Sequence, residues 1–221
     1  MAKTRYKLVA FDLDGTIISN IEFIWKTIHE HLSTDNDARK GYRDKFFRKE
    51  ISYEQWAKLD VQLWKKMGAR KKDILGAIKG IRLVPGALKT LHILKKKGYR
   101  LAVISGSIDI ALEKVLPEYA ELFDYVYLNR LYFRKDGRIL RIKATRYDFE
   151  HKLTGLKDIC MKEGISLAET VFIGDHDNDV QIAKKAGLAI AFCPNSRKLE
   201  KVSDVVVKKR NLAEILKYIL L

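Results

Sequence analysis

Carboxylate side chains close the first apolar run of the chain at a spacing that could bind a metal ion. Asp12 and Asp14 stand two residues apart at the end of residues 7–12, so an extended backbone would point both side chains the same way. Two carboxylates held close together repel each other unless a proton or a cation lies beside them. Mg²⁺ prefers such hard oxygen ligands. This pair therefore predicts a magnesium site.

Small polar residues that could bind a phosphate group follow two of the apolar runs. Gly15 predicts a tight turn with close backbone approach, and Thr16 supplies a hydroxyl and an amide. The tripeptide Ser105-Gly106-Ser107 closes the second run. We expect it to begin a helix, whose free N–H groups and dipole would bind phosphate.

A third apolar run, residues 170–175, ends in an acidic cluster. Asp175, Asp177 and Asp179 lie within five residues, with Asn178 among them. Because ligands of an open α/β sheet bind at the carboxyl ends of its strands, we expect all three runs to contribute to one phosphate and magnesium site. Asp177 could affect the metal ligands, although an acidic loop residue facing solvent is the simpler interpretation.

The elements that would position these residues follow an α/β pattern. Short apolar runs alternate with helical stretches, which predicts a Rossmann-like doubly wound parallel sheet. Gly164 stands where a helix would end, Asn211 where one would begin, and Asp136-Gly137 predicts a hairpin turn. The expected strands cover residues 7–12, 100–105, 170–175, 188–192 and 204–207.

Residues 19–80 interrupt this alternation with helical periodicity and no convincing strand. We interpret them as a small helical cap inserted after the first strand, with residues 1–18 and 81–221 forming the α/β core domain. The cap segment contains Trp25, Trp56 and Trp64, and aromatic residues in such a segment more often form its core than line a pocket.

Composition excludes several classes of protein. The 221 residues are 47% hydrophobic and 32% charged, with only three prolines, which is typical of a folded soluble domain rather than a disordered or fibrous chain. No apolar run is long enough to span a bilayer, and the first residues do not resemble a signal peptide, so we expect a cytoplasmic protein without membrane association. Cys160 and Cys193 lack the spacing of a zinc or redox site.

The chain is strongly basic. Its 43 lysines and arginines against 28 acidic residues give a formal net charge of +15, which attracts anions in general. The basic residues are scattered and no nucleic-acid-binding motif is present, which argues against a nucleic-acid partner and favours a small phosphorylated metabolite. The sequence makes no prediction about the oligomeric state.

The three motifs resemble those of a known family. The segments FDLDGT, VISGS and IGDHDND are similar to the haloacid-dehalogenase-like (HAD) superfamily of aspartate-nucleophile phosphohydrolases, and within it to the phosphoserine phosphatases, from Lys7 to Leu220. The resemblance places a further motif on Lys152, with Lys157 as the fallback. The helical insertion matches the small cap of that family.

The resemblance implies a mechanism and roles for these residues. Asp12 would attack phosphorus and form an aspartyl-phosphate, and Asp14 would serve as general acid and then as general base. Phosphate would be held by Ser105, Lys152 and the small residues of the first two motifs. Mg²⁺ would be bound by Asp12, the Asp14 backbone carbonyl and Asp175. The resemblance assigns supporting roles to Asp179 and Asn178.

The resemblance is weaker at the residues that would select the substrate. Phosphoserine phosphatases use a glutamate and a cap arginine for the amino-acid end of the substrate, and Ile21 and Asp60 occupy the matching positions here. Glu22 is the candidate to replace the glutamate, and Arg43, Arg48 or Lys58 could supply the positive charge from elsewhere in the cap. The substrate is therefore expected to be phosphoserine or another small phosphorylated metabolite.

Other functions remain open at this point. A phosphotransferase or mutase would use the same aspartyl-phosphate, and would be told from a phosphatase by a phosphorylated acceptor in place of released phosphate. A receiver-like switch would hold its phosphoryl group for longer. A basic nucleic-acid-binding protein would show salt-sensitive binding without phosphatase activity.

Overall fold

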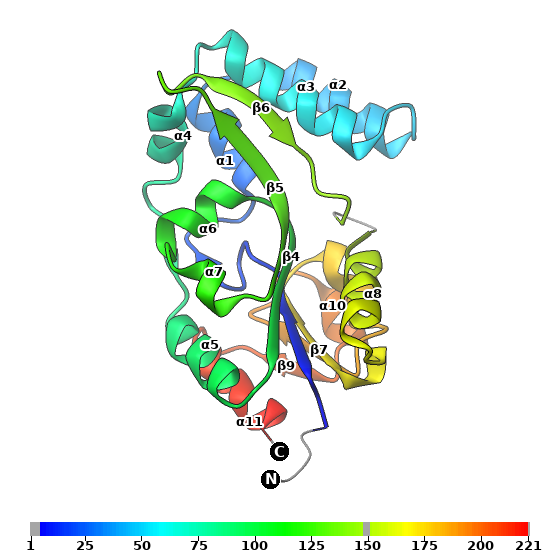
Figure 1. Ribbon diagram of the computed structural model, residues 1–221. Helices are drawn as coiled ribbons and strands as arrows, with labels where there is room; N and C mark the ends of the chain where they lie inside the picture. The colour runs from blue at the N-terminus through cyan, green and yellow to red at the C-terminus, as the bar shows by residue number, and fades with distance from the viewer. Residues whose placement is uncertain (1–4, 148–150, 221) are drawn as a thin grey trace.

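The computed structural model describes residues 5–147 and 151–220, and its centre is a seven-stranded sheet (Figure 1). Residues 1–4, 148–150 and 221, which the expected domain ranges include, lie outside the described residues. The strand order is β6-β5-β4-β1-β7-β8-β9, and every pairing is parallel except that of β5 with β6. The sheet strands are β1 (Leu8–Phe11), β4 (Arg100–Ile108), β5 (Tyr125–Phe133), β6 (Ile139–Lys143), β7 (Thr170–Gly174), β8 (Leu188–Phe192) and β9 (Val205–Val207).

Helices cover both faces of this sheet because alternate residues of the central strands face opposite sides. In β1, Val9 and Phe11 belong to one apolar cluster, while Leu8 and Ala10 belong to the other. The first cluster packs against α5 (Ala87–Lys96), α6 (Asp109–Val115), α7 (Tyr119–Leu122), η4 (Leu212–Ile215) and α11 (Leu216–Ile219). The second packs against α8 (Lys152–Glu163), α9 (Val180–Ala183) and α10 (Arg197–Val202).

The turns and helix ends agree with the local sequence signals. Gly164 ends α8 with a φ of 63°, and the Asn211 side chain accepts a hydrogen bond from the Ala213 amide at the start of η4. Gly137, with a φ of 84°, lies in the turn between β5 and β6. Short 3₁₀ helices, η2 (Leu167–Glu169) and η3 (Asp177–Asp179), flank β7.

Residues 19–80 contain helices, as the sequence predicts. They are α1 (Ile24–His31), α2 (Asn36–Phe47), α3 (Tyr53–Lys66) and α4 (Lys71–Ala77). A two-stranded antiparallel pair, β2 (Ile18–Ser19) with β3 (Arg82–Leu83), brings the two ends of this segment together. The β5–β6 hairpin packs against α3 through β6 (Figure 1). The division into a core domain and a cap stays a prediction.

The tripeptide at the end of β4 differs from the expectation. Residues 105–107 continue the strand, and α6 begins only at Asp109. Ile108 is extended and pairs with Asn129 of β5 across an irregularity in register, which keeps the chain in the sheet. The free N–H groups at this point therefore belong to an irregular strand end and not to a helix N-terminus.

Within the described residues, no helix combines the length and the apolar character that crossing a lipid bilayer requires.

Candidate active site

The carboxyl ends of β1, β4 and β7 open into one cavity of about 720 Å³. The core strands contribute carboxylates and hydroxyls to its wall, and α1 and α2 contribute residues from the segment 19–80. The lining residues include Asp12, Asp14, Ser105, Gly106, Ser107, Asp175, His176, Asp177, Asn178, Glu22, Phe23, Lys26, Phe47 and Lys198. The three predicted motifs therefore meet at one site.

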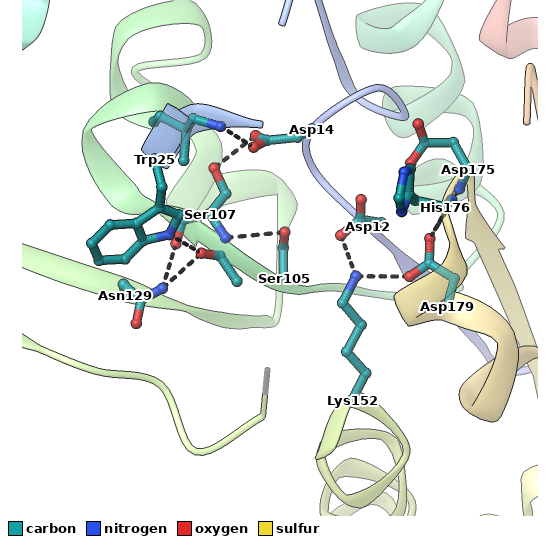
Figure 2. A network of polar contacts seen from close by, with 12 residues as sticks. Asp12, Asp14, Trp25, Ser105, Ser107, Asn129, Lys152, Asp175, His176 and Asp179 are labelled. Carbon is teal, nitrogen blue, oxygen red and sulfur yellow. Dashed lines mark hydrogen bonds and ion pairs between the residues drawn. The ribbon is translucent and has the colours of Figure 1, made fainter. Parts of the chain in front are cut away.

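Lys152 lies between two carboxylates of this site (Figure 2). Its Nζ donates to Asp12 Oδ1 at 2.6 Å and to Asp179 Oδ1 at 2.7 Å, and all three side chains are buried. Burial alone would lower the pKa of Lys152, but the charges of Asp12 and Asp179 outweigh it and hold that pKa above its usual range. Lys157 is exposed on the same helix. The structure thus brings Lys152, and not Lys157, to the nucleophile predicted from sequence.

An acidic cluster beside Lys152 has the donor atoms of a metal site. Asp12, Asp175 and Asp179 each offer a carboxylate oxygen within 4.8 Å of the others, and all are buried. Asp179 Oδ2 accepts from the amides of Asp175 and His176, so its oxygens already have donors. The Asp175 carboxylate has no hydrogen-bond donor among the described residues. The available ligands are therefore chiefly those of Asp12 and Asp175.

The electrostatics of Asp175 favour a cation at this position. Burial and the charges of Asp12 and Asp179 raise the pKa of Asp175 to about 9, because its ionised form has neither solvent nor a donor. A bound cation would relieve both effects. Gly15, with a φ of 79°, passes so close that an added Cβ would lie 2.2 Å from Asp175 Oδ2. The cluster and its backbone cradle therefore fit a metal ion.

Asp14 faces away from this cluster, toward the end of β4 and the start of α1. Its carboxylate accepts from Ser107 Oγ at 2.7 Å and from the Ile24 amide at 3.0 Å (Figure 2). Burial raises the pKa of Asp14 to about 7, although the hydrogen bond from Ser107 opposes the shift. The two aspartates of the first motif, Asp12 and Asp14, therefore have different surroundings. One is ion-paired, and the other can change protonation state near neutral pH.

Three predicted phosphate-binding residues, Gly15, Thr16 and Lys152, do not line the described cavity. Gly15 instead allows the backbone to pass close to the Asp175 carboxylate. Thr16 is fully buried, its amide donates to the Leu13 carbonyl, and its hydroxyl has no partner among the described residues. Ser105 and Gly106 do line the cavity. Asn178 also lines it, with a buried Oδ1 that lacks a hydrogen-bond partner in the part of the chain described.

Asp177 lines the cavity but is not one of the three clustered carboxylates. Its Oδ1 accepts from the Ser196 hydroxyl, and its Oδ2 lies 3.2 Å from Lys198 Nζ. These contacts lower the pKa of Asp177. Asp177 therefore joins the third motif to the segment before α10, and is neither a candidate metal ligand nor a wholly solvated acid.

The substrate candidates divide between the cavity and the outer surface, where Lys58 of α3 is exposed and paired with Glu54. Glu22 lines the cavity. Arg43 is exposed and paired with Asp44, and Arg48 is exposed and paired with Glu50, so neither cation lines the described cavity. Their position on α2 and at its end directs them to solvent, which periodicity alone did not reveal.

Ile21 and Asp60 occupy the two positions that match the family's substrate-binding residues, and both contact other residues of the protein. Ile21 packs against the main apolar cluster, and Asp60 is buried with Oδ2 3.5 Å from His29 Nε2. Neither lines the described cavity. Instead, Lys26 contributes a cation from α1, 3.5 Å from Glu22.

Sequence reasoning missed Lys26, Phe23, Phe47 and Lys198 as cavity residues. Lys26 lies four residues from Glu22, and this i, i+4 spacing was the one signal that could have identified it. Lys198 reaches the cavity wall from α10, 21 residues after Asp177, and no local pattern marks it as a cavity residue.

Comparisons with known proteins give one consistent family. Residues 6–187 match the model of the haloacid dehalogenase-like hydrolases. The phosphoserine phosphatase of Methanocaldococcus jannaschii is 36% identical over 97% of this chain and 98% of its own length. The phosphoserine phosphatase of Archaeoglobus fulgidus is 31% identical over 93% of this chain, which spans 58% of that protein.

Solved structures give the same result. A phosphoserine phosphatase described as a phospho-aspartyl intermediate analogue superimposes with a TM-score of 0.74, at 35% identity, over 97% of this chain and 99% of its own. A substrate-bound phosphoserine phosphatase complex superimposes with the same TM-score, at 33% identity, over 98% of this chain and 100% of its own.

Proposed function

The chain belongs to the haloacid dehalogenase-like hydrolase family, and we propose that it hydrolyses phosphomonoesters as a phosphoserine phosphatase-like enzyme, through a phosphoryl group carried on Asp12. The observation that carries this proposal is the Lys152 to Asp12 ion pair of 2.6 Å, which lies beside the cavity that Asp14 and Ser105 also line. The similarity to phosphoserine phosphatases over nearly the whole chain supports the same reaction.

The reaction divides into two displacements at phosphorus. The Asp12 carboxylate attacks phosphorus, the bond from phosphorus to the ester oxygen breaks, and Asp14 gives its proton to the departing oxygen. Asp14 then accepts a proton from a water molecule that attacks the aspartyl-phosphate, which releases inorganic phosphate and restores Asp12. Lys152 orients Asp12 and places positive charge beside the transferring group.

The environment of Asp14 suits both of its roles. Its pKa of about 7 keeps the protonated and ionised forms close in free energy near neutral pH. The Ser107 hydroxyl and the Ile24 amide fix the position of its carboxylate. One carboxyl group can therefore give a proton in the first displacement and take one in the second.

The metal that fits this donor set is Mg²⁺. Asp12 and Asp175 would hold it, with the Asp14 backbone carbonyl as a further oxygen ligand, while Asp179 would hold Lys152 and the loop amides in place. When bound, Mg²⁺ would lessen the repulsion between an anionic phosphate and the carboxylates around it.

The substrate is a small phosphorylated metabolite, and phosphoserine is the first candidate because the matching relatives are phosphoserine phosphatases. Glu22 and Lys26 place one negative and one positive group at the cavity, which is the charge pattern that an amine and a carboxylate require. We propose that this pair replaces the residues missing at Ile21 and Asp60.

The test is inorganic phosphate release from a panel of phosphomonoesters that includes O-phospho-L-serine, with Mg²⁺ and with a chelator. Mg²⁺-dependent release supports the function, whereas transfer to an acceptor without phosphate release would indicate a phosphotransferase. Lys26→Met should raise the KM for phosphoserine, and Lys58→Met is the matched control because Lys58 is exposed and paired with Glu54 outside the described cavity. Equal effects of the two substitutions would contradict the proposed substrate contact.

A further inference from the structure

The carbonyl oxygen of Gly106 accepts hydrogen bonds from two buried side chains. Trp25 Nε1 donates to it at 2.8 Å from α1, and Asn129 Nδ2 donates to it at 2.8 Å from β5 (Figure 2). Trp25 is 4% exposed and Asn129 is fully buried. Two donors on one oxygen, one from α1 and one from β5, fix the plane of the peptide that joins Gly106 to Ser107.

The same peptide contacts Ser105 on its other side. The N–H of Ser107 donates to Ser105 Oγ at 3.2 Å. Because a trans peptide is planar, its C=O and N–H point in opposite directions, so the donors that hold the Gly106 carbonyl also aim this N–H. Ser105 Oγ accepts that hydrogen bond, and its own proton then remains available for an oxygen atom in the cavity that Ser105 lines.

We infer that Trp25 and Asn129 are positioning residues, which act through the Gly106-Ser107 peptide to direct the Ser105 hydroxyl toward a phosphoryl oxygen. This inference rests on the proposed function, since it concerns the group that would hold phosphate. Trp25 and Asn129 do not line the described cavity, so they influence the site through this peptide and not by contact with the substrate.

The arrangement also joins residues 19–80 to the end of β4. Trp25 belongs to α1, and Asn129 Nδ2 is also 2.8 Å from the Tyr53 hydroxyl of α3. Asn129 holds the Ser107 carbonyl at 3.1 Å and accepts from the Thr145 amide. The orientation of Ser105 therefore depends on where α1 and α3 lie against the sheet.

The test is a double-mutant cycle on kcat/KM for the best phosphomonoester. Trp25→Phe removes the indole N–H and keeps a ring, and we expect kcat/KM to fall about tenfold, since a misplaced catalytic group can cost up to about a hundredfold. In a Ser105→Ala background, the same substitution should have a smaller effect, because the Ser105 hydroxyl is gone and only the contact of Ser107 with Asp14 can still be disturbed. Asn129→Asp, which replaces only the donor side of the amide, should behave in the same way.

Trp64→Phe is the matched control. Trp64 packs against Trp25, with ring centroids 5.2 Å apart, but its N–H donates to His29 and not to the β4 end. Any effect of Trp64→Phe should be equal in the Ser105 and Ser105→Ala backgrounds.

Each outcome of the cycle has one interpretation. Full activity of Trp25→Phe and Asn129→Asp, or losses that multiply with that of Ser105→Ala, would overturn the inference while leaving the phosphatase function intact. Absence of phosphate release from the unmodified protein would instead contradict the proposed function. If Trp25→Phe does not fold, as judged by circular dichroism, Asn129→Asp alone decides the question.

Discussion

The ammonium group of Lys152 lies 2.6 Å from the Asp12 carboxylate, although 140 residues separate the two in the chain. Lys152 begins α8, and Asp12 directly follows β1. The packing of α8 against one face of the sheet through Leu156 and Ile159 sets this distance. The same ion pair orients the proposed nucleophile and compensates buried negative charge.

Removal of that positive charge should destabilise the protein. Lys152→Met leaves Asp12 and Asp179 buried without their cation, which costs about 3 kcal/mol when one partner of a buried ion pair is lost. Urea denaturation measures the effect. Lys157→Met, on the exposed side of the same helix, is the control and should change stability by less than about 0.5 kcal/mol. Similar values for the two variants would show that Lys152 does not compensate these carboxylates.

Gly15→Ala should weaken the metal site beyond its effect on the backbone. The added Cβ would meet the Asp175 carboxylate, in addition to the strain of a φ of 79°. Gly68→Ala is a matched control, because Gly68 has a φ of 69° and no atom within 4 Å of the added Cβ, so only the backbone cost of about 1 kcal/mol applies. The Mg²⁺ concentration for half-maximal activity should rise for Gly15→Ala alone. A rise of the same size for Gly68→Ala would refute this account of the cradle.

Asp14→Asn should show the contributions of Asp14 to the two displacements at phosphorus separately. Without a proton donor, hydrolysis of phosphoserine should slow by at least about a hundredfold. A p-nitrophenyl ester has an acidic leaving group that needs little protonation, so its first displacement should be spared and phosphoenzyme should accumulate. A burst of nitrophenol followed by slow turnover is the expected signature. Equal losses with both esters and no burst would argue against Asp14 as the acid and base.

The buried carboxyl group of Asp109 should make the free energy of unfolding depend on pH, independently of the active site. Burial raises the pKa of Asp109 from 3.8 to about 6, so the folded state binds a proton more tightly than the unfolded state does. Stability from this group is therefore present below about pH 4 and is lost as the pH rises through about 6.

Replacing the ionisable group should remove this dependence. The Asn side chain of Asp109→Asn can still accept from the Ile110 and Leu131 amides. The stability of this variant relative to the unmodified protein should improve by about 2 kcal/mol between pH 4 and pH 8. Asp37→Asn, at an exposed residue of α2, is the control. A difference that stays constant with pH would contradict the shift assigned to Asp109.

Much of the fold could be predicted because its signals are local. Continuous apolar runs identified the central strands, since strands buried on both faces need them, and Gly164, Asn211 and Asp136-Gly137 marked ends and turns. The helix expected at Ser105 begins later because pairing of Ile108 with Asn129 extends β4, and that pairing is a tertiary effect.

The site was predictable only where a motif and a strand end coincide. Asp12, Asp14, Ser105 and Asp175 meet in one cavity because parallel strands end at one edge. Lys152 could not be told from Lys157 by spacing, since burial of one and exposure of the other depend on how α8 packs.

Contacts made by side chains from distant elements have no local pattern. Trp25 fits a helical core by its periodicity, and its hydrogen bond to Gly106 becomes visible only in the structure.

The most direct test of the central claim is to identify the residue that carries the phosphoryl group. The protein would be mixed with a phosphomonoester and Mg²⁺, quenched in acid within milliseconds, digested and examined by mass spectrometry, beside Asp12→Asn. We predict one added phosphoryl group on the peptide that contains Asp12, lost on treatment with base and absent from the variant. Phosphate release without any such adduct, or an adduct that persists in Asp12→Asn, would contradict the mechanism.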